Sequence, residues 1–364
     1  MCCRFFIGLI LIVLAACASS EHREKTMRCE SHDEVHSCPY LVGFWQMMVS
    51  DENYLVVLEN NEDGSESALT VYHLNGKKWE IKKKILSDRA NTAAIDGVVS
   101  GKDLNIVTQQ NNNHALQVVR SPIQDFIDPK IESPEFSLVK DIDISPEQRK
   151  KIDLPIGVWW NVITPLSPAE WLFGPKFVRD ANAGLQLTAN AADGHALLFS
   201  AGPAIRELDR FAIHDALWPQ AYEMDGRRYV TYIRYKEQRY PFGLFQNRRS
   251  GSIPEEGDLF SRADKEQEQN LSADLEIGPI IKFALSRHEN GKLWIFALKE
   301  AAVGTDVVAL EQTSSGWKLA ARTAVDFESE ELSVEYAHGT WHLIHAVREQ
   351  DHWAIRYQPW AISD

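Results

Sequence analysis

The sequence predicts an all-β protein, a β-propeller of six or seven four-stranded blades. Two observations predict this fold. From residue 40 onward, short apolar runs alternate with turn residues, and no stretch combines sustained helical periodicity with capping residues. The runs also recur as units of four short strands with a period of about 40 to 60 residues, which is typical of propeller blades.

The first unit begins directly after residue 40. Leu41–Val49, Tyr54–Glu59 and Leu69–Leu74 have the composition of strands, and the turn Asn75-Gly76 leads to a fourth run that begins at Trp79. An Asn-Gly pair between two such runs predicts a hairpin, because both turn positions need positive φ. The next unit repeats the plan, with strands expected over residues 94–99, 104–109, 116–120 and 136–140.

A later unit matches the first. Its strands are expected over 278–286, 293–298 and 307–310, and the turn Ser315-Gly316 leads to a fourth strand over 317–326. Set beside each other, the two fourth strands pair Trp79 with Trp317, Ile81 with Leu319, Lys84 with Arg322, and Asp88 with Asp326. This match predicts that both segments occupy the same position in their blades.

The last unit contains three strands, over residues 332–336, 341–347 and 353–360. We expect the N-terminal segment to supply the fourth strand and to close the ring. Further units are expected to begin near Ile156, Gly184 and Ala216, which leaves the number of blades at six or seven. The propeller domain is expected over residues 40–364, with a polar insertion between blades at 247–274, which is rich in Arg, Glu and Gln.

Residues 1–16 have the layout of a secretory signal peptide, with an apolar run at 5–14 behind Arg4. This run is shorter than the roughly 20 residues that a membrane-spanning helix needs. Leu14-Ala15-Ala16-Cys17 resembles the lipobox of bacterial lipoproteins. The resemblance implies a lipid on Cys17 and an outer-membrane location facing the periplasm. An ordinary cleavage site with a secreted product is the alternative. Residues 17–39 are then a tether.

The mature chain keeps two cysteines that carry no lipid. Of five cysteines, Cys2 and Cys3 leave with the signal peptide and Cys17 is the lipidation site, so Cys29 and Cys38 remain. In an oxidising compartment we expect them to form a disulfide. His32 and His36 between them make a metal site an alternative, and unpaired thiols are another. We expect no metal and no cofactor.

The formal net charge of −14 bears on partners. An acidic surface repels phosphate backbones, so we expect no nucleic-acid binding. A protein partner in the cell envelope is expected, and a basic one would complement the charge.

Three segments, over residues 225–233, 290–298 and 339–344, resemble inner strands of the sialidase-like, BNR-type propeller proteins. The resemblance implies a propeller that hydrolyses or binds glycosides. Residues 286–294 come nearest to the Asp-box of that group, but they lack its aspartate.

A sialidase-type site needs arginines for the sugar carboxylate and a tyrosine backed by a glutamate. The candidate ligand-binding residues are Arg228, Tyr232, Arg234, Arg239 and Tyr240. Strand alternation places the first three on one face. Cross-strand pairing and packing between blades is the alternative role. The catalytic residues stay unknown.

Other candidate sites receive less support. His342 and His345 are expected on opposite faces of one strand, so they do not chelate a metal together. Tryptophans could line a sugar platform, although packing between blades is the first expectation; they include Trp159, Trp160, Trp171 and Trp218.

The sequence contains no G-x-S-x-G, H-E-x-x-H, P-loop or dinucleotide motif. The favoured function is therefore a lipid-anchored protein-binding module, such as an assembly factor or an inhibitor. Enzymatic activity is not the first expectation, but the sequence leaves it open. The alternative is a sialidase-like glycoside hydrolase or a glycan-binding protein.

Overall fold

The computed structural model divides the chain into two compact units, Met1–Glu34 and Val35–Asp364. It describes residues 34–38, 40–61, 67–87, 92–110, 116–142, 172–178, 185–191, 196–200, 207–210, 216–224, 227–235, 256–263, 267–314 and 316–362. Within these residues, no helix is long and apolar enough to cross a membrane.

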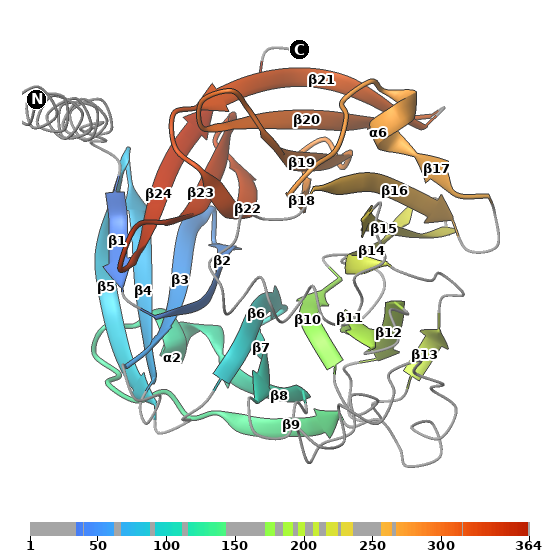
Figure 1. The fold of residues 1–364 in the computed structure, drawn as a ribbon. Helices are drawn as coiled ribbons and strands as arrows, with labels where there is room; N and C mark the ends of the chain where they lie inside the picture. The colour runs from blue at the N-terminus through green and yellow to red at the C-terminus, as the bar shows by residue number, and fades with distance from the viewer. Residues whose placement is uncertain are drawn as a thin grey trace, which may run out of the picture. The chain divides into compact units, whose positions relative to one another are not determined.

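The second unit is a six-bladed β-propeller. Six four-stranded antiparallel sheets are arranged in a ring, as Figure 1 shows. Blade 1 consists of β2 (Leu41–Val49), β3 (Glu52–Asn60), β4 (Ser67–Asn75) and β5 (Lys78–Ser87). Blade 2 consists of β6 (Thr92–Ser100), β7 (Asp103–Gln110), β8 (Leu116–Pro122) and β9 (Ser137–Ile142), with the short helix α2 (Ile123–Ile127) after β8. Blade 3 consists of β10 (Leu172–Phe177), β11 (Gln186–Ala191), β12 (Ala196–Ser200) and β13 (Glu207–Arg210).

The other three blades follow the same plan. Blade 4 consists of β14 (Leu217–Met224), β15 (Arg227–Tyr235), β16 (Gly257–Ala263) and β17 (Gln269–Asn270), and helix α6 (Leu271–Asp274) follows it. Blade 5 consists of β18 (Lys282–Arg287), β19 (Leu293–Glu300), β20 (Thr305–Thr313) and β21 (Gly316–Val325). Blade 6 consists of β22 (Ser329–Ala337), β23 (Thr340–Arg348), β24 (Trp353–Trp360) and β1 (Glu34–Cys38).

The strand β1 closes the ring. It pairs with β24 and so supplies the outermost strand of blade 6, although the other three strands of that blade come from the end of the chain. This confirms the closure expected from the sequence. It also places residues 34–38, predicted as tether, inside the propeller.

The core consists of six apolar clusters, and each lies between two adjacent blades. Strand residues alternate between the two faces of a sheet, and both faces of a blade are covered by its neighbours. The middle strands are therefore apolar on both faces: in β19, Ile295, Phe296, Ala297 and Leu298 are each fully buried.

Packing between blades explains the sequence match between the fourth strands. Trp79 of β5 meets Tyr357 of blade 6 edge to face at 5.8 Å between ring centroids. Trp317 of β21 meets Tyr222 of blade 4 in the same way at 6.0 Å. Each tryptophan thus fastens the outer strand of its blade to the preceding blade.

Two expectations need correction. Residues 257–263 and 269–274 lie in the range predicted as an insertion between blades, yet they form β16, β17 and α6 of blade 4. In β16 every second residue is buried, so the periodicity of a strand is present even though the composition is polar. A unit expected to begin near Gly184 is instead part of blade 3, since β11 is its second strand. The start near Ile156 lies outside the described residues.

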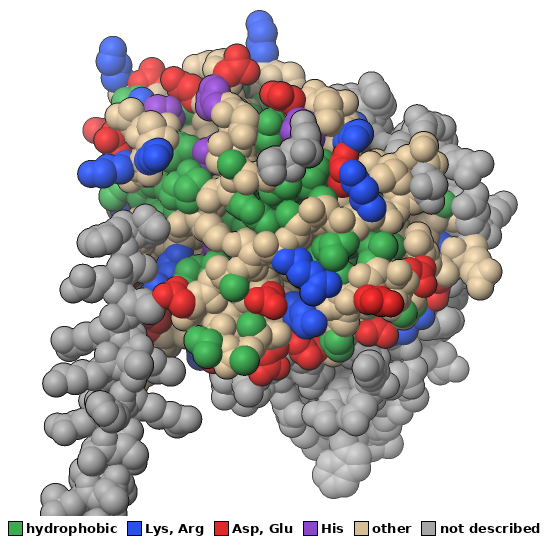
Figure 2. All heavy atoms as spheres, turned by 90° about the horizontal axis from the view of Figure 1, so that it is seen from above, with side chains coloured by type: hydrophobic (Ala, Val, Ile, Leu, Met, Phe, Trp, Pro, Cys, Tyr) green, Lys and Arg blue, Asp and Glu red, His purple; other side chains and the backbone are tan. Residues whose placement is uncertain are grey.

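On the face shown in Figure 2, acidic and basic side chains are interspersed around an apolar area. The net negative charge is therefore not gathered into one acidic patch on this face.

Candidate functional site

The inner strands of the blades, β2, β6, β10, β14, β18 and β22, surround the centre of the ring (Figure 1). Near their first residues, five of these strands change register against the second strand of their blade. Such bulges re-aim side chains and are common beside functional sites. The beginnings of the inner strands, here called the inner ends of the blades, are therefore candidate positions for a functional site.

Trp218 at the start of β14 has a strained backbone. Its φ is 56°, in the left-handed region that residues other than glycine rarely occupy. The other described non-glycine residues with positive φ lie in turns, whereas Trp218 lies within a strand. Asn190 of blade 3 holds this conformation, because its Oδ1 accepts a hydrogen bond of 2.9 Å from the Trp218 backbone N–H. Its amide also donates to the carbonyl of Ala216.

Gly174 of blade 3 leaves room for the Trp218 ring. A Cβ atom at Gly174 would lie 2.8 Å from Cε3 of Trp218, and the φ of Gly174 is +54°. Only glycine satisfies both conditions. Two adjacent blades therefore cooperate to place one aromatic side chain.

Lys282 connects this tryptophan to blade 6. The ammonium group of Lys282, at the start of β18, lies 3.0 Å from the centroid of the Trp218 ring. The same Nζ atom lies 2.9 Å from Oε1 of Glu331. The Lys282 side chain is 12% exposed and that of Glu331 is 42% exposed, so the ion pair is half open to solvent, whereas the ammonium group itself is largely shielded where it meets the ring.

Glu330 and Glu331 lie at the start of β22, where the register shifts between Ser329 and Glu331. Ser329 fixes the shift, since its N–H donates to Oγ1 of Thr305 at 2.9 Å and its Oγ lies 3.0 Å from Nδ1 of the buried His345. Burial raises the pKa of the Glu330 carboxyl, and the charge of Arg348 opposes this rise.

Trp218, Lys282, Glu330 and Glu331 form the inner-end cluster. Its two carboxyl groups have different surroundings: burial shifts Glu330 toward the protonated form, whereas Glu331 pairs with Lys282. Acid and base catalysis on glycosides uses two carboxyl groups, one that donates a proton and one that stays ionised.

The sequence patterns do not single out Lys282, Glu330 or Glu331. The available signal was a charged residue at the first position of an otherwise apolar inner strand, as in Lys282-Phe283-Ala284-Leu285. The β-bulges at the beginnings of the inner strands leave no distinct pattern in a single sequence.

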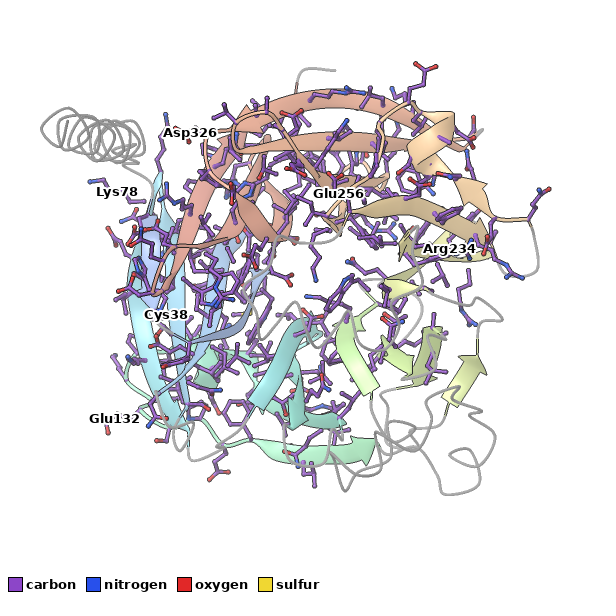
Figure 3. All side chains as sticks on the ribbon, in the orientation of Figure 1. Cys38, Lys78, Glu132, Arg234, Glu256 and Asp326 are labelled. Carbon is purple, nitrogen blue, oxygen red and sulfur yellow. The ribbon has the colours of Figure 1, made fainter. Side chains whose placement is uncertain are left out.

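The predicted candidates Tyr232 and Arg234 lie on β15 and meet Glu268, which precedes β17. The Tyr232 hydroxyl donates to Glu268 Oε1 at 2.5 Å, and Arg234 donates to both carboxylate oxygens at 2.9 and 2.8 Å. Figure 3 shows Arg234 away from the centre of the ring. Tyr232 is fully buried in the cluster between blades 3 and 4, and burial raises its pKa. This geometry favours the packing role.

Arg228 is the second residue of the same strand. It lies six positions before Arg234, which is roughly 20 Å of extended chain. The two guanidinium groups therefore do not converge on one sugar carboxylate. Arg239 and Tyr240 lie outside the described residues, as do Cys17, Trp159, Trp160 and Trp171.

Cys38 carries a free thiol and is buried. The predicted disulfide with Cys29 is therefore not formed in this structure, and Cys29 lies outside the described residues. Burial and the charge of Glu59 raise the pKa of the Cys38 thiol to about 12. His342 and His345 of β23 have separate partners, as alternation predicts: Nδ1 of His342 lies 2.8 Å from the Tyr357 hydroxyl.

The chain is thus a six-bladed propeller with a candidate site at the beginnings of its inner strands. The sialidase of Trypanosoma rangeli in complex with the inhibitor DANA has a similar structure, with a TM-score of 0.52 and 11% identity over 87% of this chain and 54% of the sialidase. This chain thus spans about half the length of that enzyme. An α-L-arabinofuranosidase of Fusarium graminearum bound to an iminosugar inhibitor gives a TM-score of 0.54 and 8% identity over 90% of this chain and 98% of the enzyme.

At these identities the likeness shows the fold alone. It supports the sialidase-like resemblance of the three sequence segments at the level of the propeller. No family model matches the sequence, and no curated protein matches it.

Proposed function

We propose that the protein binds glycosides at the inner-end cluster and hydrolyses them with the Glu330 and Glu331 pair. The observation behind the proposal is the inner-end cluster. Trp218, held in a strained conformation, contacts Lys282, and Lys282 pairs with Glu331. The neighbouring Glu330 carboxyl has a pKa that burial raises. Backbone strain that neighbouring residues enforce is typical of functional sites. Glu330 would protonate the leaving oxygen, and Glu331 would act as the base or nucleophile.

The fold is consistent with this chemistry. Both enzymes named above act on glycosidic bonds and share the propeller architecture, which is an analogy and not a demonstration of activity. Lys282 adds a positive charge next to Glu331, which would also attract an acidic sugar.

The test is a panel of chromogenic sialosides and arabinofuranosides assayed with the full chain. We expect E330Q and E331Q each to lower kcat/KM by about 100-fold or more, since each removes one acid–base partner. E300Q, at the end of β19, is the matched control and should retain activity. Y232F should also retain activity, because Tyr232 is fully buried. Loss of activity in Y232F with full activity in E330Q would overturn the proposal.

Glycan binding without turnover, lost in both glutamine variants, would support a sugar-binding protein. Without binding or turnover, the protein-binding module expected from the sequence becomes the leading hypothesis. Affinity capture from envelope extract, with the full chain as bait, tests that module directly.

We further propose that the protein acts at the periplasmic face of the outer membrane, held by lipid on Cys17. The lipobox-like residues Leu14–Cys17 support this proposal. Metabolic labelling with a clickable fatty acid should mark the wild-type chain and leave C17S unmarked. Equal labelling of C17S would contradict the anchor.

A further inference from the structure

The strand that closes the ring carries two potential metal ligands on one face. His36 and Cys38 are alternate residues of β1, so their side chains lie on the same side of the strand. That side faces Glu59 of β3 in blade 1, while β1 itself pairs with β24 of blade 6. The three residues therefore meet at the seam between the last blade and the first.

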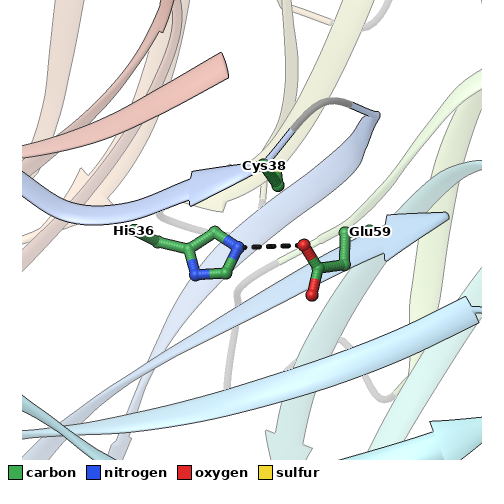
Figure 4. A group of neighbouring side chains, drawn as sticks. All are labelled: His36, Cys38 and Glu59. Carbon is green, nitrogen blue, oxygen red and sulfur yellow. Dashed lines mark hydrogen bonds and ion pairs between the residues drawn. The ribbon is translucent and has the colours of Figure 1, made fainter. Parts of the chain in front are cut away.

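Their donor atoms are close enough to bind one ion. The Cys38 Sγ, one imidazole nitrogen of His36 and one carboxylate oxygen of Glu59 all lie within 4.8 Å of one another. Figure 4 shows the three side chains pointing toward one another, with His36 Nε2 at 3.2 Å from Oε2 of Glu59. All three are shielded from solvent, with exposed fractions of 13% for the His36 side chain, 15% for that of Glu59 and 2% for Cys38.

A hydrogen bond to a neighbouring tyrosine orients the imidazole. Nδ1 of His36 lies 2.5 Å from the hydroxyl of Tyr72 on β4, which leaves Nε2 directed at the carboxylate. Metal-binding histidines usually make such a bond with the ring nitrogen that does not touch the metal. Lys84 Nζ lies 3.2 Å from Oε1 of Glu59, and the Lys84 side chain is 54% exposed.

We propose that His36, Cys38 and Glu59 bind a divalent ion such as zinc. The ion would link β1 of blade 6 to β3 of blade 1 and so stabilise the closure of the ring. One thiolate, one imidazole and one carboxylate suit zinc, which takes tetrahedral sites of such mixed ligands. Water would complete the fourth position. Binding replaces the thiol proton of Cys38, which passes to the solvent, and the His36–Glu59 hydrogen bond. No oxidation or reduction is involved.

The test is a Co²⁺ titration of the full chain in detergent, after reduction and removal of metals with a chelator. We expect one ion per chain and a thiolate-to-cobalt charge-transfer band, which Zn²⁺ then displaces. C38S should abolish the band. H36Q and E59Q should weaken binding by tenfold or more, and Y72F by about 10- to 100-fold through loss of the hydrogen bond between the Tyr72 hydroxyl and Nδ1 of His36.

His73 and Glu52 supply the matched control. They form another His–Glu pair in blade 1, with Nε2 and Oε2 at 3.4 Å, and it is not part of this cluster. H73Q should leave Co²⁺ affinity unchanged. Circular dichroism of each variant establishes that the propeller is folded before titration.

Thermal unfolding gives a second readout. Zn²⁺ should raise the Tm of the reduced wild-type chain, and C38S should keep its Tm with or without Zn²⁺. A wild-type chain with no charge-transfer band, or a band that persists in C38S, would overturn the proposal. The result is independent of glycoside activity, since the inner-end cluster shares no residue with this site.

Discussion

Single residues at the inner ends of the blades set the geometry of the candidate site. Trp218 keeps a positive φ because Asn190 bonds its backbone N–H and because Gly174 leaves space for its ring. Any other residue at position 174 would have both an unfavourable positive φ and a side chain that collides with Trp218.

We therefore expect G174A to lower the free energy of unfolding by about 2 kcal/mol or more, from the strained φ and the collision with Trp218. G101A is the control: Gly101 has a φ of +63° but nothing within 4 Å of the added Cβ, so about 1 kcal/mol is expected. Urea unfolding of both variants measures the difference. Equal losses in the two would show that the contact with Trp218 contributes nothing.

His345 makes stability depend on pH. Burial lowers its pKa from 6.5 to about 4. The unfolded chain therefore binds the proton first as the pH falls, and the folded state loses stability from about pH 6.5 down to about pH 4. Above pH 6.5 this contribution is fully present. Burial lowers the pKa of His342 as well, so it acts in the same direction.

Between pH 7 and pH 5 we expect the free energy of unfolding to fall by about 2 kcal/mol on account of His345. Urea unfolding at both values measures the loss. In H345Q the loss should be smaller by most of that amount, whereas H338Q, which alters an exposed histidine in a turn, should behave as wild type. An unchanged pH dependence in H345Q would rule out this assignment.

Among structural elements, the inner strands depend on polar bridges between blades. Gln220 of β14 is one: its amide donates to the carbonyl of Phe283 at 3.1 Å and its Oε1 accepts from the N–H of Leu285 at 3.1 Å. Asp96 of β6 similarly accepts from the N–H of Phe177 in blade 3 at 2.7 Å. Adjacent blades are separate sheets whose described strands do not pair with one another, so these side chains supply hydrogen bonds between the blades instead.

We expect Q220L to lower the free energy of unfolding by about 2 kcal/mol, because two backbone groups of β18 lose their partners. Q124L, on the exposed side of α2, should change it by less than about 0.5 kcal/mol. Chemical denaturation of the two variants tests the bridge. A Q220L variant as stable as wild type would mean that water replaces the amide.

Strands were predictable where both faces of a sheet are buried. Leu41–Val49 was expected from its apolar run and is β2 with the same bounds. The pattern failed in β16, whose residues Gly257–Ala263 alternate between buried and partly buried positions with a polar composition. Charge and glycine content there masked the period of two. The contacts of the candidate site were not predictable, because they depend on bulges and on side chains from different blades.

At the scale of the whole molecule, the number of blades and the closure follow from the repeat. Five blades use consecutive strands, and blade 6 borrows β1 from the other end of the second unit. The three-stranded last repeat made this closure predictable. The sequence raised a metal site that included His36 and Cys38 as an alternative, but it did not point to Glu59, which only the closed ring brings close to them.

Removal of β1 should open the ring. We expect a chain that begins at residue 40 to have a lower Tm than one that begins at residue 33, and to self-associate, because β24 becomes an exposed edge strand. Differential scanning calorimetry and light scattering measure the two effects. A synthetic peptide of residues 33–39 should restore the Tm. Equal Tm values for both chains would contradict a structural role for the closure.

The closing strand also dictates an order of events during synthesis. β1 leaves the ribosome before every other strand of the propeller, yet its partner β24 ends only at Trp360. Blade 6 is therefore the last blade to form, and β1 stays unpaired until β24 has been synthesised. Pairing of β1 with β24 closes a loop that spans almost the whole propeller. The ring of a chain of this design therefore stays open until its final strands have emerged.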